Sequence, residues 1–94
     1  MVIQSVHIKP NSFTEVSFHT SLFNIEVQKI HGKNIVFRFN PGEGESYIKD
    51  GTTGQFETAG RRKNFVINSV KKENGLLSVN CSLVNKLMLK TEVA

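Results

Sequence analysis

The alternation of apolar and polar side chains is the feature of this sequence that most constrains its fold. Phe23, Ile25 and Val27 are separated by polar residues. The same spacing of two recurs in four further sets: Ile35, Phe37 and Phe39; Phe65 and Ile67; Leu77, Val79, Cys81 and Leu83; Leu87, Leu89, Thr91 and Val93. Successive side chains of a strand point to opposite faces, whereas a helix repeats near every 3.6 residues. The pattern therefore predicts β-strands.

No segment sustains apolar side chains at the spacing of an amphipathic helix, so an all-β chain is expected. Strands are predicted in segments bounded by glycine, proline and asparagine: 2–9, 12–19, 22–30, 34–40, 45–49, 53–59, 63–72, 76–84 and 86–93. Strands that are apolar on one face must close a core, which predicts a single β domain over residues 1–94. An antiparallel β-sandwich of about seven to nine short strands is favoured over a small closed or partly open β-barrel.

The apolar pattern also predicts the register of the hairpin that turns around residues 31–33. A slip of one residue would set apolar side chains opposite polar ones. A loop of three or five residues pairs Val27 with Phe37, whereas a two-residue loop would set Gln28 against Ile35. The longer loop is therefore expected.

A second hairpin is predicted around residues 73–75, where a glycine follows an asparagine. A three-residue loop with glycine in the left-handed conformation suits this segment. That loop places Ile67 opposite Cys81, Phe65 opposite Leu83 and Ser69 opposite Val79.

Composition bounds the class of protein. The chain has 94 residues, 38% of them hydrophobic and 21% charged, which is a globular composition with one core. The sequence has no secretory leader and no apolar run near the roughly 18 residues that cross a bilayer. The lone Cys81 excludes an internal disulfide and a four-thiolate zinc site. A soluble, cytoplasmic protein with no membrane association is expected.

Positive charge is concentrated in the second half of the chain. Residues 1–46 are neutral overall, so the net charge of +4 lies entirely in residues 47–94. Arg61, Arg62 and Lys63 follow a glycine directly, and Lys71 and Lys72 lie at the other end of the same predicted strand, roughly 25 Å away. Nucleic-acid phosphates could bridge the two clusters, and the guanidinium groups could donate paired hydrogen bonds to them. The alternative interpretation is a solvated turn with charged strand ends.

Residues that carry enzyme chemistry are few. His7, His19 and His31 lack the close spacing of a metal motif, and surface positions are expected for all three. Cys81 lies on an apolar strand face, where a thiol behaves as a small buried hydrophobe.

The acidic pair Glu43 and Glu45 suggests calcium or acid–base chemistry, yet no further carboxylates cluster nearby in the sequence. The glycines and the proline of this segment explain it as a loop. These observations predict a non-enzymatic protein without a metal or another cofactor.

Two functions remain open. The first is a binding module that contacts nucleic acid through Arg61, Arg62, Lys63, Lys71 and Lys72. The second is a protein–protein interaction module, such as an assembly subunit or a small inhibitor from a phage or mobile element, that uses an exposed sheet face or edge strand. Leu22 and Ile30, which fall on the polar face of their predicted strand, favour the second. A homodimer formed through strand 86–93 is a further expectation.

Overall fold

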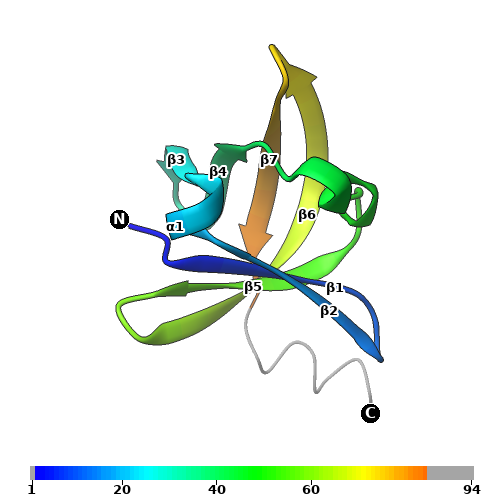
Figure 1. Ribbon diagram of the computed structural model, residues 1–94. Helices are drawn as coiled ribbons and strands as arrows, with labels where there is room; N and C mark the ends of the chain where they lie inside the picture. The colour runs from blue at the N-terminus through cyan, green and yellow to red at the C-terminus, as the bar shows by residue number, and fades with distance from the viewer. Residues whose placement is uncertain (1, 85–94) are drawn as a thin grey trace.

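Seven strands join one antiparallel sheet in the computed structural model, which describes residues 2–84 (Figure 1). The elements in chain order are β1 (Ser5–Asn11), β2 (Thr14–His19), α1 (Thr20–Phe23), β3 (Glu26–His31), β4 (Asn34–Phe39), the 3-10 helix η1 (Gly42–Tyr47), β5 (Thr53–Thr58), β6 (Arg61–Glu73) and β7 (Leu76–Leu83). The strands lie side by side in the order β2-β1-β5-β6-β7-β4-β3.

The sheet curls so strongly that strands far apart in its order meet across the core. Phe18 belongs to β2, the first strand, and Phe39 to β4, the sixth, yet their rings lie 5.2 Å apart in an edge-to-face arrangement. The outermost strands β2 and β3 do not pair with each other, so the sheet is not closed. The expected all-β antiparallel fold is confirmed, in the form of a single curled and open sheet.

One face of the sheet forms the core, as the alternating pattern predicts. The buried apolar residues are Ile3, Val6, Ile8, Phe18, Ile25, Ile35, Phe37, Phe39, Ile48, Phe56, Phe65, Ile67, Leu77, Val79 and Cys81. Phenylalanine rings dominate this core, with Phe37 between Phe39 and Phe65, at 5.9 Å and 6.0 Å. Each fully buried ring contributes about 1.5–3 kcal/mol relative to an exposed one.

The β6–β7 hairpin has a shorter turn than the sequence suggests. Asn74 and Gly75 both have positive φ, at 51° and 79°, which is the conformation of a two-residue type I′ turn. Ile67 faces Cys81 as predicted, but a β-bulge then shifts the register, and Ser69 faces Asn80. The predicted three-residue loop and the Ser69–Val79 pair are therefore wrong, because the bulge absorbs the residue that the loop was expected to contain.

The β3–β4 hairpin also combines a two-residue turn with a bulge. Val27 faces Phe37 as predicted, yet the connection is the two-residue turn Gly32-Lys33, with Gly32 at φ 62°. A bulge at Gln28 again takes up the extra residue. The predicted loop of three or five residues is wrong for this reason.

Two other predicted strands also differ in the structure. Segment 45–49 was expected to be a strand, but it overlaps η1, which packs so tightly that a Cβ on Gly44 would lie 2.6 Å from the Phe18 ring. Segment 22–30 begins within α1, where Leu22 is exposed, and Ile30 is half-exposed on β3. The predicted strand 86–93 lies outside the described residues.

The turn between β5 and β6 contains a residue in a strained backbone conformation, and a substitution should relieve this strain. Ala59 and Gly60 adopt φ values of 51° and 76°, as a type I′ turn requires, and alanine has no preference for this conformation. We expect Ala59→Asn to raise the free energy of unfolding by about 0.5–1 kcal/mol, because asparagine tolerates positive φ. Urea denaturation measures this gain, and Ala59→Val, with a β-branched side chain, should lower stability instead. Equal stability of both variants would contradict the assignment of strain.

Candidate functional site

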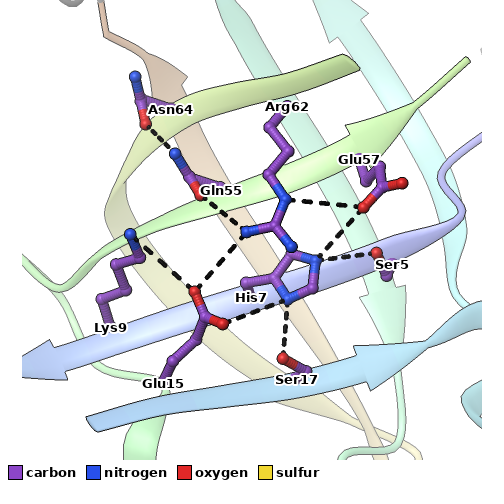
Figure 2. A network of polar contacts seen from close by, with 9 residues as sticks. All are labelled: Ser5, His7, Lys9, Glu15, Ser17, Gln55, Glu57, Arg62 and Asn64. Carbon is purple, nitrogen blue, oxygen red and sulfur yellow. Dashed lines mark hydrogen bonds and ion pairs between the residues drawn. The ribbon is translucent and has the colours of Figure 1, made fainter. Parts of the chain in front are cut away.

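A network of polar side chains covers the outer face of the sheet over β1, β2, β5 and β6 (Figure 2). Its members are Ser5, His7, Lys9, Glu15, Ser17, Gln55, Glu57, Arg62 and Asn64. Because Val6 and Ile8 of β1 point into the core, Ser5 and His7 point to this outer face. Both are nevertheless buried, at 2% and 4% exposure, because they lie within this network of longer side chains from neighbouring strands.

His7 lies at the centre of the network. Its Nε2 is 3.0 Å from the hydroxyl of Ser5, and its Nδ1 is 2.7 Å from the hydroxyl of Ser17. Hydroxyl groups both donate and accept, so they satisfy both nitrogens of a neutral imidazole. The expected surface position is wrong for His7, whereas His19 and His31 are exposed.

The surroundings of His7 favour its neutral form. Burial lowers the pKa of His7 below 6.5, the ordinary value of a histidine, and the nearby Arg62 guanidinium lowers it further. Glu15 and Glu57 oppose this effect, with carboxylate oxygens 4.0 Å and 3.8 Å from the ring nitrogens, and His19 adds a smaller lowering contribution. Desolvation of the imidazole, together with the positive charge of Arg62 and the smaller contribution of His19, outweighs the two carboxylates.

This shift predicts a pH dependence of stability. Because the pKa of His7 is lower in the folded state, its contribution is fully present above pH 6.5 and is lost as the pH falls through the folded-state pKa. We expect the free energy of unfolding to fall as the pH is lowered from about 7.5 to below 6.5, as measured by urea denaturation. The decline should be smaller in His7→Gln, which removes the imidazole. An equal decline in both proteins would show that other groups cause it.

Arg62 joins the network to the rest of the outer face. Its Nε lies 3.7 Å from Glu57, and its Nη1 lies 3.8 Å from Glu15 and donates to Gln55 at 3.3 Å. Gln55 in turn donates to Asn64 at 2.7 Å. Arg62 is therefore held in place by two carboxylates from different strands, and it is not the freely solvated turn residue that its sequence position suggested.

A hollow of about 650 Å³ opens beside Arg62, and three basic residues belong to its lining. It is lined by Lys33, Gln55, Arg62, Lys63, Asn64, Leu83 and Val84. We call it the basic hollow. Two backbone hydrogen bonds bring its walls together: Leu83 N–H donates to Lys33 at 2.8 Å, and Val84 N–H donates to Asn64 at 2.9 Å.

Lys33 is the basic residue of this hollow that sequence reasoning missed. It lies about 30 positions before Arg62 and Lys63, in the half of the chain that has no net charge. The strand order places β4 next to β7 and β7 next to β6, so the turn that carries Lys33 reaches the start of β6. No local signal in the sequence identifies this neighbour.

The five predicted phosphate contacts fall into two unequal groups at opposite ends of β6 (Figure 1). Lys71 pairs with Glu73 at 3.1 Å and Lys72 with Glu45 at 3.2 Å. Arg61 and Lys63 make no ion pair with a carboxylate among residues 2–84. The structure thus separates a compensated end of the strand from an end that retains positive charge.

The described residues offer little for other chemistry. Cys81 is buried, and burial raises its pKa to about 12, so the thiol stays protonated at neutral pH. Within residues 2–84, no three His, Cys, Asp or Glu side chains gather closely enough to hold a metal ion. No helix in that range has the length and apolar character needed to cross a bilayer.

Comparisons with known proteins provide no family for this chain. Protein-family models, curated proteins and solved structures gave no match. A function must therefore be inferred from the charges and geometry of the basic hollow itself, because a fold alone does not imply an activity.

Proposed function

We propose that this protein is a non-enzymatic binding module that contacts nucleic-acid phosphates through the basic hollow. The convergence of Lys33, Arg62 and Lys63 on one hollow is the observation that supports the proposal most strongly. These cations come from two hairpins, and Arg61 begins the same strand that carries the last two. Basic side chains gathered on one surface are the electrostatic footprint of a nucleic-acid-binding protein.

The fixed position of Arg62 makes it suitable for an anion. Its Nε and Nη1 contact Glu15, Glu57 and Gln55, whereas its Nη2 makes no such contact with residues 2–84. A guanidinium group held on one side can direct its remaining N–H groups at a phosphate with little further loss of entropy. The ammonium groups of Lys63 and Lys33 are point charges on flexible side chains, so they can follow the phosphate backbone of the ligand.

The lining of the hollow also predicts the character of the binding. It has amide groups from Gln55 and Asn64 but no aromatic side chain on which a base could stack. Base stacking contributes about 1–3 kcal/mol per base in single-strand binders, so the affinity here should come mainly from phosphate contacts. Little sequence preference and strong dependence on salt are expected.

Lys71 and Lys72 play a smaller part in this proposal than the sequence suggested. Their ammonium groups pair with carboxylates of Glu73 and Glu45. A phosphate would have to compete with these partners, so fewer counterions would be released at that end of β6. We therefore place the principal contacts at Lys33, Arg61, Arg62 and Lys63.

A salt titration tests the proposal. The anisotropy of a short labelled single-stranded oligonucleotide should rise with protein concentration, and the binding constant should fall steeply as salt increases. The slope of log K against log salt concentration should be about −0.7 per phosphate neutralised on a single strand, so the four principal contacts give a slope of about −2.8. No binding at low salt would contradict the proposal, and so would binding that salt does not weaken.

A further inference from the structure

A second hollow of about 540 Å³ runs beside β2, at the open side of the curled sheet. It is lined by Val16, Ser17, Phe18, Phe23, Pro41, Gly42, Glu43, Gly44 and Tyr47. We call it the β2 groove. It shares no lining residue with the basic hollow, so the two surfaces can be tested separately.

The backbone of β2 has one edge without a strand partner among residues 2–84, because β2 is the first strand of the sheet. Thr20 N–H donates to Gln4 at 2.9 Å on the paired side. Backbone groups of an antiparallel strand alternate between its two edges, so Phe18 and Val16 also bond to β1. The N–H and C=O groups of Ser17 and the N–H of His19 therefore face away from the sheet, whereas the C=O of His19, the N-cap residue of α1, accepts the first hydrogen bond of that helix.

The two outer strands are not equivalent. β3 contains the bulge at Gln28 and exposes Lys29 beside it, and both features discourage another chain from pairing with an edge. On the other side of the sheet, the irregular residues of the β1–β2 pair lie in β1, between Ile8 and Asn11, and β2 itself runs regularly from Val16 to His19. β2 is thus the outer strand with an edge regular enough to template a new strand.

The groove beside this edge is apolar and prearranged. The Phe18 and Phe23 rings lie 5.2 Å apart in an edge-to-face arrangement, so their positions are fixed before any ligand arrives. Tyr47 is 42% exposed and adds a partly wetted aromatic wall. Glu43 is the single charged residue in the lining, which gives this groove a negative charge on a protein of net charge +4.

We propose that the β2 edge and the β2 groove bind an extended peptide segment of a partner protein as an added strand. Main-chain hydrogen bonds to Ser17 and His19 hold the peptide, while apolar side chains of one peptide face enter the groove. A cationic residue of the peptide lies near Glu43, because the lining of the groove contains this carboxylate and no basic residue to compensate it. At about 3.3 Å per residue, the six residues of β2 accommodate a peptide of about six residues.

A random peptide library displayed on phage, selected on the intact protein, tests this proposal. The enriched sequences should alternate apolar with other residues and should include a lysine or arginine. A synthetic peptide of the enriched sequence should bind the wild-type protein in calorimetry, and Glu43→Lys should weaken that binding at least about tenfold. Absence of enrichment above background, or a consensus without alternation, would overturn the proposal.

One substitution separates strand addition from simple apolar contact. His19 is exposed and its φ of −94° needs a change of only some tens of degrees to accept a proline, so His19→Pro removes one N–H that faces away from the sheet at a small cost in backbone strain. This variant should bind the peptide at least about tenfold more weakly, whereas the control His19→Ala, which keeps the N–H, should bind normally. Equal binding by both variants would overturn the proposal.

Two further measurements test whether a peptide of a partner protein is the added strand. In the wild-type protein, the amide protons of Ser17 and His19 should exchange more slowly with solvent when the synthetic peptide is bound, and unchanged exchange would overturn the proposal even if His19→Pro does not fold. Sedimentation should show a monomer without peptide. A dimer that His19→Pro dissociates would identify a second copy of this chain as the occupant and would also overturn the proposal.

Discussion

Replacement of Gly54 by alanine is expected to lower the free energy of unfolding by about 3 kcal/mol, the largest stability effect we foresee for a single methyl group. Gly54 lies in β5 between Ile8 of β1 and Phe65 of β6. A Cβ at this position would lie 2.6 Å from the backbone oxygen of His7 and 2.7 Å from the Phe65 ring. The Phe65 ring is fully buried, and the His7 oxygen is part of a central strand, so neither can move aside easily.

Chemical denaturation with urea measures this loss. Thr53→Ala is the matched control. The Thr53 side chain directly precedes Gly54 and is exposed, so its truncation should lower the free energy of unfolding by less than about 0.5 kcal/mol. Combining Gly54→Ala with Phe65→Leu should give a smaller loss than the sum of the two single changes, since leucine leaves room for the new methyl group. A loss below about 1 kcal/mol for Gly54→Ala would contradict the tight approach of β1 and β5.

Removal of Lys33 and Lys63 together is expected to weaken oligonucleotide binding at least about tenfold at low salt, if the proposed function is right. Both lysines belong to the lining of the basic hollow, and neither makes an ion pair with a described carboxylate. Two fewer phosphate contacts on a single strand should also make the salt slope shallower by about 1.4. Anisotropy titrations of Lys33→Ala/Lys63→Ala at several salt concentrations measure both effects.

Lys71 and Lys72, at the other end of β6, provide a control with the same change in net charge. Lys71→Ala/Lys72→Ala should leave the affinity within about threefold of the wild type, because Glu73 and Glu45 already compensate these two charges. Equal weakening by both double variants would show that net charge alone drives the binding. That result would contradict a site at the basic hollow.

Arg62 is a poor first choice for mutation, although it belongs to the same hollow. Its guanidinium lies between the carboxylates of Glu15 and Glu57, and it helps to lower the pKa of His7. Arg62→Ala would therefore rearrange the polar network as well as remove a phosphate contact, and a loss of binding would have two causes. Lys63 separates these causes because it does not belong to the polar network.

The strand faces were predictable from the sequence because side-chain direction has a period of two. The pairs Val27–Phe37 and Ile67–Cys81 and the burial of Cys81 follow from that period alone. The exact turns did not follow from it. Each of these hairpins combines a two-residue turn with a bulge, and a bulge changes the register without leaving a clear signal in the apolar pattern.

The candidate site was predictable only in part. Arg61, Arg62 and Lys63 are adjacent in the sequence, so their shared charge was visible, and the structure leaves Arg61 and Lys63 without a described carboxylate partner. The carboxylates that compensate Lys72 and hold Arg62 come from distant segments, Glu45 and Glu15 among them. Such contacts depend on side chains that the sequence separates by many residues.

The sequence by itself determined most of the strand segments and which strand faces are apolar, since both properties depend largely on neighbours within a few positions, although segment 45–49 and the start of segment 22–30 are helical in the structure. The tertiary structure decided the strand order, the curl of the sheet, the burial of His7 and the meeting of Lys33 with Lys63. Strand order is set by which apolar faces can close one core together, and that depends on every strand at once. A lysine in one turn and a lysine at the start of a distant strand become neighbours through that order alone.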